Sequence, residues 1–526
     1  MKKICFNKWV FFLFLIIFLG FLLRVYRVAD IPSGFFADEA ANGFNAYKIL
    51  TTGRDEHGIP FPFYFRSFGD YRNPVVIYSM IPLVAIFGLN EFAVRLTMVI
   101  YGTGTILLLF FLTREIFFKS SPFTKTVLPL TSALFLSISP WHIQFSRTGF
   151  EFISMPFFLV LSLFLFFRFI HRGPLYLLLL SAFSFVITFY TYYPIQLVLI
   201  PFIIGIIFMH KKILFFKTKA FRISSILFFL IFLLGMLAFV KGVFNGQALT
   251  RFHSVSPLSQ SNIKEIAPKL IDTYLKHFSL DFLFTKGDID MPGHFITRHS
   301  VHHLGELYLF QLPLLIVGLI FLSLRFPKIL GLFLLWFSLY PIGSAIVGNG
   351  PFAHRSIFGL IPFQILSAFG LTVIFEFFNK IEIEGRLLQS LLKIIIGGFL
   401  MTIFFFSLQQ YVYKYFIEYR LYSSDFWGWQ YGPREIIRYF VSEEKNYDEL
   451  IMSGQFNSPE IFLKFYAPNN CQKCKIGNVK LYNPDKRQLF ALSPEEVKEM
   501  EYVTKKIIYY PNQQIAFKVV EFKHGQ

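Results

Sequence analysis

Eleven long apolar runs, separated by mostly short connections, constrain the fold of this chain more than any other feature of its sequence. Each run holds about 16–24 residues, near the roughly 20 residues with which a helix crosses the hydrocarbon core of a bilayer. The runs are continuous rather than alternating, as in FFLFLIIFLGFLL over 11–23, which favours helices over barrel strands. The predicted spans are 9–28, 92–112, 126–145, 150–170, 174–191, 194–210, 222–241, 307–324, 329–347, 355–378 and 389–410.

The composition excludes a soluble globular protein. Of 526 residues, 55% are hydrophobic and only 16% are charged, and Phe alone accounts for 73. A soluble domain of this composition would expose large apolar patches and aggregate, so the lipid bilayer is the expected solvent. The net charge of +18 would suggest a nucleic-acid partner in a soluble protein, but here the basic residues lie between apolar runs, and no nucleic acid is expected.

The charge of the connections alternates along the chain. Basic residues concentrate in every second connection, and such connections face the cytoplasm in multi-span proteins. The apolar segment 74–88 is short and contains Pro82; counting it as a span would break the alternation, so we place it as a helix lying at the outer interface. The pattern predicts a multi-pass protein of the plasma (inner) membrane with a cytoplasmic N-terminus. The basic connections are 114–125, 168–172, 211–222, 325–328 and 380–393.

This sidedness divides the chain into a transmembrane domain over 1–410 and an extracytoplasmic domain over 411–526. Within the first domain, a first outer loop at 29–91 and a long outer loop at 242–306 face the same side. The C-terminal part mixes polar and apolar residues. It reads as a small α/β domain, with an amphipathic helix at 432–444 and strands at 506–511 and 514–522.

Two cysteines in this external domain are separated by two residues, in the motif CQKC. Cys471 and Cys474 have no second Cys or His pair beside them, so a complete zinc site is disfavoured. The pattern favours a local disulfide, which an oxidising compartment outside the cytoplasm would permit.

An acidic pair, Asp38-Glu39, follows the first span in the sequence FADEAANGFNAYKIL over 36–50. The spacing of polar and apolar residues predicts a helix there, which Gly53 can end. Two interpretations of the pair stay open. The carboxylates favour the N-terminus of the helix through its dipole, by about 0.3–1 kcal/mol, or they carry chemistry at the membrane edge, where ionisable groups are costly and usually functional.

Several further motifs accompany the acidic pair: GRDEHGIP at 53–60, a Pro74 break, NEFAVRL at 90–96, HIQFSRTGFE at 142–151 and GELYLFQLPLLIVGL at 305–319. Together they resemble the protein O-mannosyltransferase and aminoarabinose-transferase family, over roughly residues 30–380. The resemblance implies an all-α polytopic membrane protein with the C-type glycosyltransferase fold and about eleven transmembrane helices. It also implies a polyprenyl-phosphate sugar donor and transfer to an acceptor hydroxyl with inversion at the anomeric carbon.

The resemblance assigns roles to particular residues. Asp38 matches the catalytic base, with Glu39 as its paired neighbour, and Glu151 matches a second acid. Arg147 matches a basic residue of the family, although the same arginine is also explained as a helix anchor at the lipid headgroups. Arg72, just before Pro74, lies where relatives carry a Lys that touches the lipid phosphate. The residues before Pro74 are YRN rather than the usual acid–Lys pair, which argues against a metal there.

A phosphate leaving group needs cations to hold its developing charge rather than a strong acid to protonate it. Outward-facing His354 and Arg355 are therefore added to Arg72 and Arg147 as candidate substrate contacts. The polar residues of the first outer loop complete the predicted binding set, which adds Asp55, His57 and Tyr78.

Three histidines near the end of the long outer loop allow two interpretations. His299, His302 and His303 lie within about one helical turn, and either bind a metal or belong to an amphipathic outer helix that rims the lipid groove. Glu306 is the only nearby carboxylate in the sequence, which favours the helix. We expect no cofactor; a divalent metal stays conceivable without support from the sequence.

Three classes of function remain open at this point. The first is a glycosyltransferase whose acceptor is a protein, a glycolipid or a wall polymer. The second is a transporter or flippase of a lipid-linked or polar substrate, although transporters usually carry midplane charges in broken helices. The third is a non-catalytic binding or assembly protein that works through its external domain.

Overall fold

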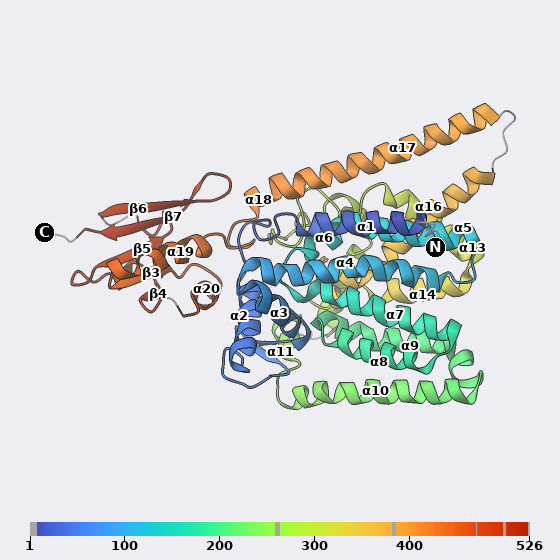
Figure 1. The fold of residues 1–526 in the computed structure, drawn as a ribbon, viewed down its shortest axis with the longest axis horizontal. Helices are drawn as coiled ribbons and strands as arrows, with labels where there is room; N and C mark the ends of the chain where they lie inside the picture. The colour runs from blue at the N-terminus through green and yellow to red at the C-terminus, as the bar shows by residue number, and fades with distance from the viewer. Residues whose placement is uncertain (1–7, 258–262, 381–385, 470, 498–500, 524–526) are drawn as a thin grey trace, which may run out of the picture.

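The computed structural model describes residues 8–257, 263–380, 386–469, 471–497 and 501–523. It is a bundle of long helices that run side by side, with a sheet-bearing domain at one end (Figure 1). The bundle contains α1 (Lys8–Val25), α4 (Glu91–Ile116), α5 (Pro122–Ile138), α7 (Ser154–Arg172), α8 (Leu175–Phe189), α9 (Tyr193–Phe216), α10 (Lys219–Phe244), α13 (Gln311–Arg325), α14 (Pro327–Leu339), α16 (Leu360–Lys380) and α17 (Arg386–Tyr413).

The predicted polytopic membrane fold is confirmed. Within the described residues, eight helices are long and apolar enough to cross a membrane, or nine if α5 and the short α6 (Pro140–Ser146), which meet at 57°, form one bent span. Two further predicted spans coincide with α8 and α13, which have 15 residues each. Every predicted run therefore contains a helix, while the total of eleven crossings stays a prediction.

The ends of the bundle differ in what they carry. The start of α1 and the connection from α9 to α10 lie at the end opposite the sheet-bearing domain (Figure 1). The domain end carries α2 (Ala37–Thr52), α3 (Pro74–Phe87) and α11 (Thr250–Val255), and the chain there also forms a β1–β2 hairpin (Phe65–Ser67 and Asp70–Arg72). The segment predicted as interfacial is thus the separate, 14-residue helix α3.

The helix α2 begins and ends where the sequence predicts. Its N-cap is Phe36, and the side chain of Glu39 accepts a hydrogen bond from the Phe36 backbone N–H at 3.1 Å. Gly53 ends the helix in the left-handed conformation, with φ 66°, which costs a glycine little. The acidic pair is therefore fixed at the first turn of a short helix at one end of the bundle.

Glycines allow two of the bundle helices to touch through their backbones. A Cβ added at Gly370 of α16 would lie 2.0 Å from the carbonyl oxygen of Leu314 in α13, and one added at Gly318 would lie 2.3 Å from the carbonyl oxygen of Leu366. Small residues at such crossings replace the hydrophobic driving force that lipid cannot supply. By contrast, α17 diverges from the bundle and is largely exposed (Figure 1).

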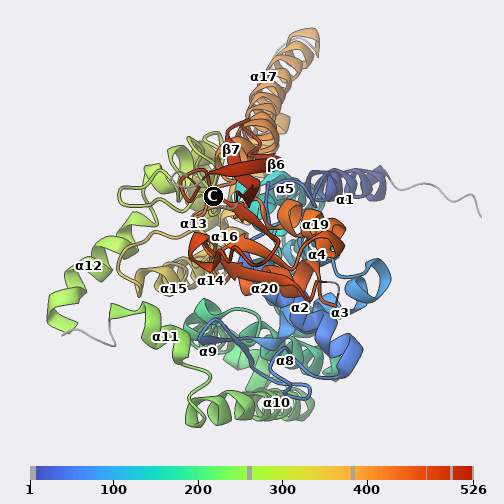
Figure 2. The same ribbon diagram turned by 90° about the vertical axis from the view of Figure 1, so that its left-hand side faces the viewer.

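The C-terminal region contains a five-stranded sheet in the order β4-β3-β5-β7-β6. Figure 2 shows this region facing the viewer, with β6 and β7 labelled. β3 pairs in parallel with β4 and β5, while β5 with β7 and β6 with β7 are antiparallel. The predicted helix and both predicted strands are present, as α19, β6 and β7. The elements are α18 (Tyr419–Tyr422), α19 (Pro433–Glu443), β3 (Glu449–Ser453), α20 (Glu460–Tyr466), β4 (Cys474–Gly477), β5 (Gln488–Leu492), β6 (Tyr502–Tyr509) and β7 (Ile515–Phe522).

Cys471 and Cys474 form a disulfide directly before and at the start of β4, as the spacing predicts. The α/β character of this region is therefore confirmed. The boundary between the two domains at residue 410 stays a prediction, because α17 continues to Tyr413 and passes through the turn Lys414–Glu418 into α18 without a clear break.

Candidate functional site

A cavity of about 460 Å³ lies at the end of the bundle that carries the C-terminal domain. Its walls come from α2, β2, the turn before α7, the start of α9, the segment around α11, and the turn that precedes α16. Five of the predicted site residues line it. These are Asp38, Arg72, Glu151, His354 and Arg355.

An ion pair between Asp38 and Arg72 is the central polar contact of this cavity. An Arg72 guanidinium nitrogen lies 2.6 Å from Asp38 Oδ1, and a second one donates to the side-chain oxygen of Asn42 at 3.4 Å. Burial alone would lower the pKa of Arg72, but the carboxylates of Asp38 and Glu151 outweigh it and raise the pKa. The arginine therefore stays charged and holds Asp38, which is partly exposed, at the cavity wall.

Two arginines of the long outer loop also line the cavity, and the sequence analysis missed both. Arg251, on α11, approaches Asp70 at 3.3 Å. Arg298 stacks over the ring of Phe36 at 4.0 Å and donates to the Trp427 carbonyl at 2.6 Å. With Arg72 and Arg355, they give the cavity four lining arginines, beside the carboxylates of Asp38, Asp70 and Glu151.

Aromatic rings form much of the remaining wall. The rings of Phe36 and Phe150 contact each other, and Phe152 packs against Tyr192 and against the ring of His354. Burial raises the pKa of the Tyr192 hydroxyl, so it stays protonated. Rings of this kind can stack on the apolar face of a sugar, while the charged groups bind its polar substituents.

Glu39 does not line the cavity, which corrects the prediction that it joins Asp38 in the site. It is fully buried in an ion pair with Arg95, whose nitrogens contact its two oxygens at 2.9 and 3.0 Å. It also accepts hydrogen bonds from the backbone N–H groups of Phe36 and Gly149. Successive residues of a helix point about 100° apart, so the two carboxylates leave α2 in different directions.

Arg147 is also placed differently from the prediction. It is fully buried, and it donates to the backbone carbonyls of Leu23, Arg24, Tyr26 and Ile31 at 2.7–2.9 Å. These carbonyls belong to the end of α1 and the turn after it, where an isolated helix leaves such groups unpaired. The arginine therefore anchors a helix end to the protein interior and does not reach the cavity.

The remaining three predicted residues support the first outer loop. Asp55 accepts hydrogen bonds from the backbone N–H groups of His57 and Ile59 at 2.9 and 2.8 Å, which closes a turn. The His57 ring contacts the Arg66 carbonyl, and the Tyr78 hydroxyl donates to the Pro62 carbonyl at 2.9 Å. None of the three lines the cavity, so their assignment as substrate contacts stays a prediction.

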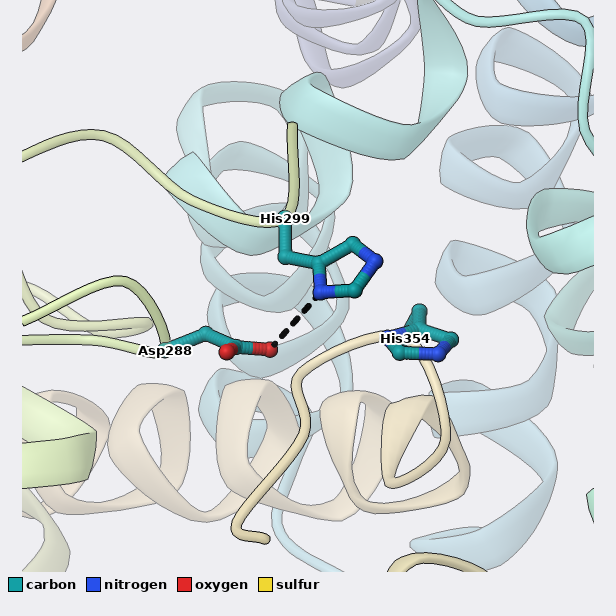
Figure 3. A group of neighbouring side chains, drawn as sticks. All are labelled: Asp288, His299 and His354. Carbon is teal, nitrogen blue, oxygen red and sulfur yellow. Dashed lines mark ion pairs between the residues drawn. The ribbon is translucent and has the colours of Figure 1, made fainter. Parts of the chain in front are cut away.

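The histidine segment is a loop rather than the predicted amphipathic helix. The carboxylates that its sequence seemed to lack come from Asp288 and Asp290, a few residues earlier. His302 and His303 pair with Asp290, whereas His299 turns inward to Asp288 and His354 (Figure 3). The sequence did not indicate the group of Asp288, His299 and His354, because His354 lies in the turn before α16, far from the other two along the chain.

The C-terminal domain contributes to the same site. Asn457, in the loop after β3, lines the cavity. Lys464 and Tyr466 of α20 bind Glu56 and Glu91 of the bundle at 2.9 and 2.8 Å. These contacts hold the domain against the end of the bundle, so that one of its loops closes part of the cavity wall.

Residues 72–239 match the family model described as dolichyl-phosphate-mannose-protein mannosyltransferase. This segment is similar to that family. The matched segment includes the cavity residues Arg72, Glu151 and Tyr192, and the resemblance drawn from the sequence motifs is thereby confirmed. No curated protein sequence matches the chain.

Solved structures confirm the C-type fold, which is that of membrane glycosyltransferases using lipid-phosphate sugar donors. ArnT from Cupriavidus metallidurans bound to undecaprenyl phosphate is similar over 97% of both chains, with 10% sequence identity and a TM-score of 0.52. AglB, the oligosaccharyltransferase of Archaeoglobus fulgidus in complex with an inhibitory peptide and a dolichol-phosphate, has 13% identity and a TM-score of 0.51. That match covers 88% of this chain and 59% of AglB, so the chain spans about three fifths of its length.

Proposed function

We propose that the protein is a membrane glycosyltransferase that moves a sugar from a polyprenyl-phosphate carrier to an acceptor hydroxyl in this cavity. One observation carries the proposal: a carboxylate, Asp38, is paired with Arg72 at the wall of a cavity lined by further guanidinium groups. The similarity of residues 72–239 to a mannosyltransferase family and the overall fold support the same reaction class.

The proposed chemistry uses each of these groups. The bond between the anomeric carbon and the phosphate oxygen breaks, and the acceptor oxygen bonds to the same carbon from the opposite face, which inverts its configuration. Asp38 takes the hydroxyl proton of the acceptor as general base. The phosphate leaves as an anion, and guanidinium groups bind it with two parallel hydrogen bonds.

Arg72 links the two halves of this reaction. Before the donor binds, its guanidinium is engaged by Asp38. A donor phosphate that enters the cavity competes for Arg72 and frees the carboxylate for the acceptor hydroxyl. Arg251, Arg298 and Arg355 lie on other parts of the wall and are available to share the phosphate charge.

The location of transfer is part of the proposal. We place the reaction at the non-cytoplasmic side of the plasma membrane. The cavity is lined by residues of α2 and α11, and these helices lie at the end of the bundle opposite the basic α9–α10 connection (Figure 1). The acceptor is a protein, a glycolipid or a wall polymer.

A transfer assay tests this function. The purified protein is given a labelled polyprenyl-phosphate sugar, with mannose first, and the loss of label from the lipid is followed in the presence of envelope acceptors. Asp38→Asn should lower turnover about 10²–10⁴-fold, the range of general-base catalysis. The matched control is Asp281→Asn, the same change at an exposed aspartate of the outer loop that pairs with Lys286.

The outcome decides between the enzyme and the transporter. Turnover that survives Asp38→Asn unchanged would refute the role of Asp38. If the labelled lipid crosses liposome membranes intact and no sugar leaves it, the transporter or flippase is correct instead.

A further inference from the structure

Three buried side chains from separate parts of the chain meet beside the cavity. Asp288 follows the helical turn Asp281–Thr285, His299 lies in the loop before α13, and His354 lies in the turn before α16 (Figure 3). Each is less than a tenth exposed, and their ligand-type atoms all lie within 4.8 Å of one another. Asp288 and His299 belong to the same segment before α13, whereas His354 joins them from beyond α13 and α14.

The hydrogen bonds of this group are incomplete. Among the described residues, the Nδ1 atoms of His299 and His354 are buried without a hydrogen-bond partner. The nearest oxygen of Asp288 is 3.6 Å from His299 Nδ1, which is too long for a hydrogen bond. Leaving such an atom unpaired in the interior costs about 1–3 kcal/mol, so two of them side by side call for a partner.

We propose that Asp288, His299 and His354 bind one divalent transition-metal ion, for which Zn²⁺ is the best match. Two imidazoles and one carboxylate form the donor set of zinc sites that keep an open coordination position. Imidazole ligands disfavour Mg²⁺ and Ca²⁺, which prefer oxygen. His299 and His354 also line the cavity, so a bound ion would adjoin the space that we assign to the donor phosphate.

The surroundings of Asp288 orient it as a ligand. One of its oxygens contacts His294 Nδ1 at 2.7 Å, and the other accepts a hydrogen bond from the Ala353 backbone N–H at 2.7 Å. The second ring nitrogen of His294 contacts the Asn349 carbonyl at 3.0 Å. Such outer partners fix the direction of a ligating group and raise metal affinity about 10–100-fold.

The neighbouring charges set a limit on this affinity. Arg298 and Arg355 adjoin the two histidines in sequence, and both repel a cation, while Asp288 attracts it. We therefore expect weaker binding than in a structural zinc site. An anion in the cavity would offset the repulsion, which would couple metal binding to donor binding if the proposed function is correct.

Metal binding is measured directly, without sugar transfer. The full-length protein, purified without a histidine tag, is stripped with a chelator and titrated with Zn²⁺, and bound zinc is counted by mass spectrometry. We expect one zinc ion per chain that is absent from His299→Ala/His354→Ala. Co²⁺ in place of Zn²⁺ should give the visible absorption of a four-coordinate site in the unmodified protein alone.

Two further variants grade the effect. Asp288→Asn keeps the size of the side chain and removes a ligand, so zinc affinity should fall by more than about 100-fold, beyond the loss from an outer partner. His294→Gln removes only the outer partner, and the fall should stay within about 10–100-fold. His302→Ala/His303→Ala is the matched control, because both histidines lie in the same loop but pair with Asp290, and it should bind zinc normally.

The proposal is overturned if the unmodified protein binds no more zinc than His299→Ala/His354→Ala, or if the control variant loses zinc equally. Elution volume and melting temperature of each variant establish that the protein is folded. Because the readout is bound metal, a protein that binds zinc but transfers no sugar would contradict only the proposed function.

Discussion

Replacing each of the two neighbouring carboxylates of α2 separately by its amide distinguishes a group that reacts with substrate from one that stabilises the fold. Glu39→Gln changes a fully buried side chain that accepts four hydrogen bonds, two of them from Arg95. Asp38→Asn changes a side chain that is 27% exposed and pairs with Arg72. Both substitutions keep the size of the side chain, so the comparison isolates charge.

The structure sets different costs for the two changes. The amide introduced by Glu39→Gln would carry one oxygen and one NH₂ group. Because each carboxylate oxygen accepts from Arg95 and from a backbone N–H, the NH₂ group would face both donors in either orientation. Removing one member of a buried ion pair costs about 3–5 kcal/mol, because the other charge stays buried. Arg72 and Asp38 are 14% and 27% exposed, so their pair is less buried than that of Arg95 and Glu39, and its loss should cost less than the roughly 3–5 kcal/mol of a fully buried pair.

Two measurements on each variant check this difference. The free energy of unfolding is measured by denaturant titration in mixed micelles, and sugar transfer is measured per folded molecule. Glu39→Gln should lose about 3–5 kcal/mol of stability and keep most of its turnover when folded. Asp38→Asn should lose less stability than Glu39→Gln and should lose turnover. A stable but inactive Glu39→Gln, or an Asp38→Asn that unfolds as easily as Glu39→Gln, would refute the division of roles.

Three other perturbations test the fold. Arg147→Ala leaves four carbonyls at the end of α1 unpaired, and the free energy of unfolding should fall by at least about 3 kcal/mol; an unchanged denaturation midpoint would contradict the anchor. Gly370→Ala should cost about 1–3 kcal/mol through overpacking at the α13–α16 crossing, whereas Gly398→Ala, where a Cβ meets no atom within 4 Å, should be neutral in the same titration. Reporter fusions should be cytoplasmic after Lys125 and external after Tyr411, and the reverse would overturn the predicted sidedness.

The spans could be predicted from the sequence because lipid leaves a chain few choices. A continuous apolar run must pair its backbone internally, so hydropathy alone locates helices such as α4 and α10. The shorter helices α8 and α13 were also found, since they fill the alternation of basic connections. The predicted ends of the helices were less accurate than their positions. For example, the predicted span 307–324 corresponds to α13, which begins at Gln311.

The site was predicted only in part, because a charged residue near a membrane edge has several uses. Asp38 and Arg72 were found from their position around the first outer loop. Arg147 looks the same in sequence, but its direction is set by the unpaired carbonyls of α1, which only the packed structure reveals. Arg251 and Arg298 lie in a long polar loop, where no apolar periodicity indicates which side chains turn inward.

The pair Asp38-Glu39 did contain a usable signal. Glu39 is the third residue of α2 and returns to the N-cap backbone, as in a capping box. The N-cap is Phe36 instead of the usual Ser or Thr, so the motif was not recognised. Helical geometry alone predicts that the side chains of two neighbouring residues point in different directions. On this ground, the two acids would not both face the same cavity.

The presence of Asn457 in the cavity wall means that the proposed reaction chamber is not formed by the membrane bundle alone. A chimera that keeps the membrane bundle but carries the C-terminal domain of a relative would have a different residue at this place in the cavity wall. Selectivity for acceptors could thus diversify through a domain that no bilayer constrains, while the chemistry at α2 stays untouched.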